Sequence, residues 1–299
     1  MLKWAAVPVA LLAAGIETGR AGAIPLFAHQ YAVPCAKCHS VIPHLNEFGA
    51  AFLANGERFP GISSGSALPL SAKVNLVDSS ESQGSGPNGE GLPKAIVDEV
   101  ELFSSATIGS RASYFVEQYV VDGGEPGLLR DAWVGERINP WDARIPVYVQ
   151  GGQFTLPLPV DPETFRDTYR HYTPYDLTVG ENPFDFFEPA MGARVAIGDP
   201  LRGLNGTFFA GPGYTRQSGL AATGVDTELY LQDAMGAWNF SGFRYDGLRP
   251  IAGGPADRFT RTGFGLTYGQ WSRFSSEAVL ISGSDSTCGL SHFAGCASS

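Results

Sequence analysis

The chain has 299 residues, of which 38 are glycine and 21 proline; 12% of the residues are aromatic and only 17% are charged. This turn-rich, aromatic composition is typical of strands and argues against a helical soluble enzyme of the same length. The formal net charge of -10 argues against nucleic acid as a partner and suits cationic partners.

Residues 1–23 have the three parts of a secretory signal peptide. Lys3 is the positive end, an apolar run extends from Ala5 to Gly15, and Ala21-Gly22-Ala23 is a small-residue cleavage site. We therefore expect export and a mature chain that begins near Ile24. The apolar run is too short to span a bilayer, and no later segment approaches about eighteen uninterrupted apolar residues, so strands must make any membrane crossing.

The next motif, Cys35-Ala36-Lys37-Cys38-His39, has the spacing of a c-type haem attachment site. Each thiol adds to one vinyl group of the porphyrin, and the adjacent histidine reaches the iron from the same turn. The motif predicts one covalent haem c held by Cys35, Cys38 and His39, with His39 as the proximal metal ligand. The alternative is half of a zinc site, but zinc needs four ligands and the sequence has no second Cys-x-x-Cys.

The sixth iron ligand stays open at this point. The candidates are His29 and His44, which lie near the motif, and Met191, Met235, His171 and His292, which are distant in sequence. An axial methionine would raise the reduction potential relative to a second histidine. The remaining cysteines, Cys288 and Cys296, are candidates for a disulfide with each other.

A helix is expected directly after the motif. Pro43 is placed to open it, and Asn55-Gly56 is a stop signal. Its apolar face would consist of Leu45, Phe48, Phe52 and Leu53. This face suits one side of a haem, although an ordinary amphipathic helix predicts the same pattern. Residues 24–70 are too few to bury a haem alone, so we expect the rest of the chain to supply further walls.

The remaining sequence alternates apolar and polar residues with the period of a strand. Eleven candidate strands begin near residues 71, 97, 112, 129, 144, 188, 204, 226, 237, 259 and 271. Short joins at 110–111, 139–143, 199–203 and 269–270 alternate with longer joins at 79–94, 122–127, 154–188 and 247–258. Short periplasmic turns alternating with long external loops are typical of an outer-membrane barrel, whereas a soluble β-sandwich gives no reason for that alternation.

The predicted fold is therefore mainly β, an antiparallel transmembrane β-barrel preceded by a short α-helical segment that binds haem. We expect a signal peptide over 1–23, a monohaem cytochrome c segment over 24–70 and a porin-like barrel over 71–299. Bacterial barrels normally have an even number of strands. Because eleven is odd and residues 288–299 do not form an amphipathic strand, we expect closing strands to be missing from this chain.

Three stretches together resemble a known family: Pro34 to His39, Leu45-Asn46-Glu47-Phe48-Gly49, and Phe52 with Asn55-Gly56, all followed by alternating strands. They are similar to the fused outer-membrane monohaem cytochrome-porins of iron-oxidising bacteria. Residues 129–133 and 151–154 look similar to porin strands of that family. Only Cys35, Cys38 and His39 are carried over as site residues.

The resemblance implies a protein in the outer membrane, in contact with its lipid. It would take electrons from extracellular Fe(II), or another reductant, and deliver them through a barrel-housed haem to a periplasmic cytochrome or similar redox carrier. Iron(II) oxidase activity is a further expectation. Two alternatives remain: a diffusion porin whose haem segment is a structural plug or sensor, and a periplasmic cytochrome that carries a β-sandwich.

The longest loop is rich in carboxylates, which suit a hard cation such as Fe(II). They are Asp161, Glu163, Asp167, Asp176, Glu181, Asp185 and Glu188. We expect this loop at the external mouth of the barrel. A solvated acidic loop is an equally good interpretation, so these residues are not assigned as a site.

Overall fold

A computed structural model describes residues 25–59, 69–79, 94–123, 125–161, 175, 179, 182, 184–212, 224–249, 256–270 and 274–286. The predicted signal peptide and the residues His171, Cys288, His292 and Cys296 lie outside the described residues. In these ranges, no helix combines the length and the apolar character needed to cross a membrane.

The N-terminal segment consists of short elements. It contains α1 (Pro25–Gln30), the 3-10 helix η1 (Cys35–Lys37), the paired strands β1 (His39–Val41) and β2 (His44–Leu45), and α2 (Glu47–Ala54). The prediction that Pro43 opens the helix is wrong. The helix begins at Glu47 because the Asn46 side chain caps it, accepting a hydrogen bond from the Gly49 amide at 3.0 Å.

The apolar face expected on this helix is also divided. Leu45 lies on β2 and is buried together with Phe52, whereas Phe48 and Leu53 are 37% and 44% exposed. Leu45 and Phe52 therefore pack inside the protein, whereas Phe48 and Leu53 are accessible to a ligand.

The rest of the described chain forms one sheet. Its strands are β3 (Leu70–Ser79), β4 (Lys94–Ile108), β5 (Ala112–Asp122), β6 (Glu125–Pro126), β7 (Leu129–Arg137), β8 (Val147–Phe154), β9 (Ala190–Asp199), β10 (Arg202–Pro212), β11 (Val225–Met235), β12 (Trp238–Arg249), β13 (Asp257–Tyr268) and β14 (Ser276–Asp285). They follow the order β14-β13-β12-β11-β10-β9-β8-β7-β5-β4-β3, with β6 paired to β5. Every neighbouring pair is antiparallel, so the prediction of a mainly β, antiparallel fold is confirmed.

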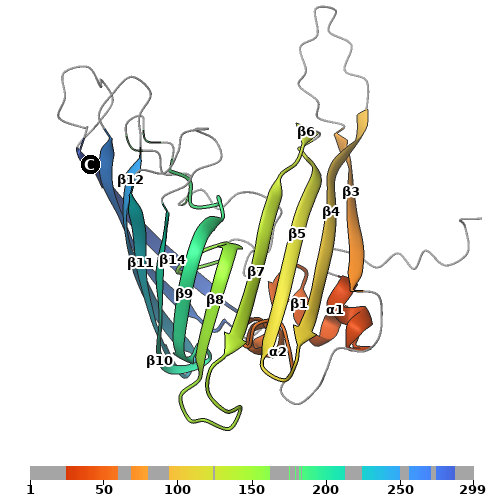
Figure 1. Ribbon diagram of the computed structural model, residues 1–299, viewed down its shortest axis with the longest axis horizontal. Helices are drawn as coiled ribbons and strands as arrows, with labels where there is room; N and C mark the ends of the chain where they lie inside the picture. The colour runs from red at the N-terminus through yellow and green to blue at the C-terminus, as the bar shows by residue number, and fades with distance from the viewer. Residues whose placement is uncertain are drawn as a thin grey trace, which may run out of the picture.

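Figure 1 shows these strands side by side in one curved layer, with short turns at one end and longer connections at the other. The β4–β5 and β11–β12 turns are tight because Gly109 and Gly236 each adopt a φ of 63°, which favours glycine. The helices α1 and α2 lie at the end of the layer that carries the short turns.

The two faces of the sheet differ sharply in chemistry. Alternate side chains point to the outer face, which carries most of the large exposed apolar groups. Those with exposed fractions between 56% and 72% include Leu70, Val74, Leu76, Leu204, Val225, Phe264 and Leu280. The inner face buries charged and polar groups, including Glu101, Gln150, Asp226, Glu228, Arg249, Asp257 and Arg261. The same inner face also buries an aromatic core that includes Phe103, Phe115, Phe209, Phe243 and Phe259.

Buried ion pairs make the polar inner face possible. Arg249 pairs with Asp226, and Arg261 pairs with Asp285; all four side chains are at most 4% exposed. On β3, Lys73 contacts the Glu101 carboxylate at 2.6 Å. In each of these pairs the partner of opposite sign offsets the cost of removing the charge from water.

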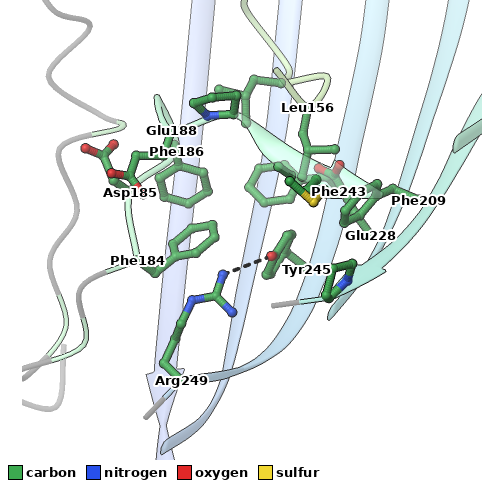
Figure 2. Close-up of a pocket in the computed structure, with 15 residues that line it drawn as sticks. Leu156, Phe184, Asp185, Phe186, Glu188, Phe209, Glu228, Phe243, Tyr245 and Arg249 are labelled. Atoms are coloured by element: carbon green, nitrogen blue, oxygen red, sulfur yellow. Dashed lines mark hydrogen bonds between the residues drawn. The ribbon is translucent and has the colours of Figure 1, made fainter. Parts of the chain in front are cut away.

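Described residues of the segment between β8 and β9 lie against this inner face. Ser241 of β12 donates a hydrogen bond to the Pro159 carbonyl at 3.2 Å. Figure 2 shows Phe184 and Phe186 pointing towards aromatic side chains of the strands, and the rings of Phe184 and Tyr245 are 4.8 Å apart. The space that remains between the side chains of Figure 2 is only about 30 Å³.

Candidate haem site and interior chamber

The attachment motif forms a single tight turn. The Cys38 amide donates to the Cys35 carbonyl at 3.1 Å, closing η1. Both thiols are free; Cys35 is exposed and Cys38 is half-buried. Partial burial and the neighbouring Cys35 raise the pKa of the Cys38 thiol. The motif therefore presents two unoxidised thiols, which covalent attachment to a porphyrin requires.

His39 is held in one orientation by the backbone. Its Nδ1 lies 3.0 Å from the Pro43 carbonyl oxygen, which can only accept, so Nδ1 carries the proton and Nε2 keeps its lone pair. Partial burial lowers the pKa of this imidazole. The ring is consequently neutral near pH 7, with Nε2 as the nitrogen that can bind a metal, and the carbonyl acts as the usual outer-shell partner.

Asn46 and Gly49 join the motif to α2. The Asn46 amide donates to the Cys38 carbonyl at 2.8 Å, and its side chain donates to the Lys37 carbonyl at 3.1 Å. A Cβ atom on Gly49 would collide with the same Cys38 carbonyl, so the helix approaches the motif as closely as it does only because this residue is glycine.

The surroundings of the motif fit a c-type haem. The side chains of Val41, Phe48 and Leu53 are 57%, 37% and 44% exposed, and an apolar macrocycle could cover them. The Lys37 ammonium lies 4.4 Å from the Phe48 ring centre. Across the described ranges, no three His, Cys, Asp or Glu side chains gather closely enough to bind a metal ion directly.

The segment is fastened to the sheet at its short-turn end. Arg58 donates to the Ala112 and Ser110 carbonyls at 2.8 and 2.9 Å, and the Ser113 hydroxyl donates to the Gly56 carbonyl at 2.7 Å. The Arg58 guanidinium lies 5.4 Å from the Trp141 ring centre. These contacts make the strands part of the wall around α2, in line with the expectation that so short a segment needs borrowed walls.

A chamber of about 910 Å³ lies between α2 and the inner face of the sheet. That volume is at the upper end of ordinary ligand pockets. Its wall includes Phe48 and Leu53 of the helix, Trp133 and Tyr148 of the strands, and Pro159 of the β8–β9 segment. Seven carboxylate side chains and four arginines also line it.

The acidic loop is divided by the structure. Asp161 lies on the wall of the large chamber, whereas Asp185 and Glu188 lie on the smaller pocket of Figure 2. The other four carboxylates, Glu163, Asp167, Asp176 and Glu181, lie outside the described residues. The described members therefore line interior spaces of the protein rather than a single cluster.

No protein-family model, curated protein or solved structure matches this chain. The likeness to cytochrome-porins accordingly depends on the residues quoted above, and it stays a prediction.

The candidates for a sixth ligand are spread through the fold. His44 is buried on β2, whereas His29 is exposed on α1. Met191 on β9 and Met235 on β11 are 44% and 55% exposed. No contact among the described residues singles out one of these four side chains as the distal haem ligand.

Sequence reasoning overlooked two residues of the site. An asparagine directly before an apolar helix is a capping signal, and on that basis Asn46 was predictable. Glu57 had no such signal. It follows the helix in a left-handed conformation with a φ of 59°, and it is only 7% exposed on the chamber wall.

Proposed function

We propose that this protein is an outer-membrane c-type cytochrome that passes electrons from an extracellular donor, Fe(II) being the donor class, to a periplasmic redox carrier. The observation that carries the proposal is a combination. A haem-attachment turn is fastened to one end of a sheet whose outer face is apolar and whose inner face is charged.

The membrane location is supported by the outer face. The long strands of the sheet have 8 to 15 residues, against the roughly 9–11 that a tilted strand needs to cross a bilayer. At the short-turn end, Trp238 and Tyr268 are 45% and 39% exposed, with ring centres 4.7 Å apart. Aromatic side chains of this kind mark the membrane–water interface of outer-membrane barrels. We propose that the curved sheet forms the wall of such a barrel.

The outer face also carries exposed charged pairs, one of which is Arg244 with Asp246 at 2.7 Å on β12. The Thr260 hydroxyl donates to the same carboxylate. Because the two charges of this pair compensate each other, it adds no net charge to the outer face.

The orientation follows from the connections. Short turns of outer-membrane barrels face the periplasm, and the haem-attachment segment is fastened at that end. Cys35 and Cys38 would hold the porphyrin, and His39 Nε2 would bind the iron. The bound haem would supply one-electron redox chemistry. Because Cys35 is exposed, the edge of the haem bound to it would be accessible to a soluble electron carrier.

Electron transfer is favoured over solute diffusion by the parts of the interior that side chains fill. The N-terminal segment is fastened to the short-turn end of the curved layer, and Phe184 and Phe186 pack against Tyr245 and Phe243 on its inner face. Both groups would obstruct a solute, whereas an electron needs only a redox centre.

Reconstitution tests the proposal. The purified protein, with its haem oxidised, is placed in liposomes, and ferrous iron is added outside. The proposal predicts stoichiometric haem reduction, read from the absorption spectrum, together with little leakage of a trapped small solute. Rapid solute flux with a haem that external iron does not reduce would favour the diffusion porin instead.

A further inference from the structure

Several buried polar atoms on the chamber wall have no hydrogen-bond partner within the described part of the chain. Among them are Glu57 Oε2, Gln150 Nε2 and Asn239 Oδ1. Each side chain is at most 8% exposed. Unsatisfied buried polar groups in native proteins call for a ligand or ordered water, so the chamber is built to hold a hydrated species.

The charged side chains of the wall indicate whether the bound species is a cation or an anion. Asp131 and Glu117 are near enough to Glu57 to repel its carboxylate, and Arg194 is the cation that opposes them. Arg194 is itself engaged, donating from Nε to Gln150 Oε1 at 2.6 Å and lying 4.8 Å from the Phe154 ring centre. Seven carboxylates and four arginines line the wall, so a cation that displaces the carboxyl protons meets more partners of opposite sign than an anion does.

The spacing of the carboxylates selects how that cation is held. No three acidic or histidine side chains in the described ranges converge on one point, which argues against direct ligation. A small hard cation that keeps its water shell can instead donate hydrogen bonds from those waters to oxygens farther apart. Glu57 Oε2 and Asn239 Oδ1 are both acceptors, as such waters require.

We infer that the chamber is a holding site for a hydrated divalent cation, bound through its water shell by Glu57 with Glu117 and Asp131. This inference rests on the proposed function, because the electron donor proposed there is itself a divalent cation. It assigns the chamber beside the haem segment as the binding site of that donor. Burial of Glu57, followed by repulsion from Asp131 and Glu117, raises its pKa well above the usual value. Binding therefore displaces a proton from Glu57, and the affinity rises with pH.

The test uses Mn²⁺ as a redox-inactive probe on the full chain in detergent. Free Mn²⁺ is counted by electron paramagnetic resonance during a titration, and bound Mn²⁺ is examined for exchangeable water protons. We expect saturable binding that retains water. Glu57→Gln weakens this binding by about tenfold or more, the range for losing an outer-shell partner. The matched control is Glu136→Gln, since Glu136 is 49% exposed and lies outside the chamber.

Glu117→Gln is the second variant, because Glu117 lies on β5, a different element of the same wall. Unchanged visible spectra and circular dichroism confirm that each variant is folded. An equal Mn²⁺ affinity in wild type, Glu57→Gln and Glu117→Gln, or no saturable binding at all, overturns the inference.

The two proposals fail in different ways. If Mn²⁺ binding depends on Glu57 but Fe²⁺ does not reduce the haem, the cation site is supported and Fe²⁺ is excluded as the electron donor. If Fe²⁺ reduces the haem at the same rate in wild type and Glu57→Gln, the proposed function is supported and the cation site is contradicted.

Discussion

Gly49 shows how one missing Cβ positions the haem-attachment turn. The Cys38 carbonyl occupies the space that a side chain would need, and the Leu45 side chain closes the other side. A methyl group there must push the helix away from the turn, since one of the clashing atoms is backbone.

Gly49→Ala is therefore expected to destabilise the protein by roughly 1–3 kcal/mol, the usual cost of overpacking, and to lower the yield of covalent haem. The control is Gly151→Ala, because nothing lies within 4 Å of a Cβ at Gly151. Denaturant unfolding and haem absorbance per chain provide the measurement. Equal haem yields in the two variants would mean that the close approach of α2 is not needed.

Glu57 links stability to pH. Burial raises its pKa in the folded state, and the unfolded chain keeps the ordinary value of about 4.3. The folded state thus binds the proton more tightly. The stability that depends on this proton is full below about pH 4 and is lost as pH rises through the folded pKa.

Glu57→Gln keeps the shape and removes the titration. Above that window we expect the variant to be more stable than wild type by roughly 1–3 kcal/mol, the cost of a buried unsatisfied polar group, with the difference vanishing in acid. Unfolding is followed at several pH values with a chelator present, and Glu136→Gln serves as control. A pH-independent difference between Glu57→Gln and wild type would contradict this assignment.

At the scale of elements, the strands were largely predictable. Period-two alternation placed the beginnings of β5 and β7 at residues 112 and 129, where the structure has them, because both strands bury one face and expose the other. β14 begins at Ser276 rather than near 271, and the two-residue β6 was not expected. Strand ends depend on pairing with neighbours, which local sequence does not encode.

The interior was beyond sequence reasoning for a related reason. Glu57, Gln150 and Asn239 are far apart in the chain, yet all three line one chamber. The haem motif, in contrast, is local: two thiols and a histidine within five residues can be recognised before any fold is known.

The outer face of β10 offers a test of the membrane location. Phe208 is 50% exposed near the middle of this strand, and it pairs with Leu229 on one side and Val195 on the other. In a bilayer, Phe208→Arg is expected to cost about 2–4 kcal/mol, because a charge at the midplane must leave water. Leu204→Arg, near the short-turn end of the same strand, is expected to cost about 0–1 kcal/mol.

Unfolding from lipid vesicles, with both variants compared to wild type, gives the two values. A water-soluble sheet predicts the opposite outcome, since an arginine in place of an exposed phenylalanine would leave stability unchanged and improve solubility. Recovery of the protein in the soluble periplasmic fraction would likewise favour a β-sandwich cytochrome.

At the scale of the whole molecule, two features depend on each other. The N-terminal segment is held against the curved sheet by hydrogen bonds from Arg58 to Ser110 and Ala112 and from Ser113 to Gly56. The sheet in turn buries charged side chains beside an aromatic core. We interpret the molecule as a redox station placed at one end of an apolar-coated sheet.

Mass spectrometry of the exported chain tests this account most directly. Peptides that span Cys35 and Cys38, released by a protease that does not cleave at Lys37, are expected to carry one haem through two thioether bonds, with the iron spectrum of a histidine-ligated c-type centre. Exported protein in which both cysteines are unmodified and no porphyrin is attached would contradict the account.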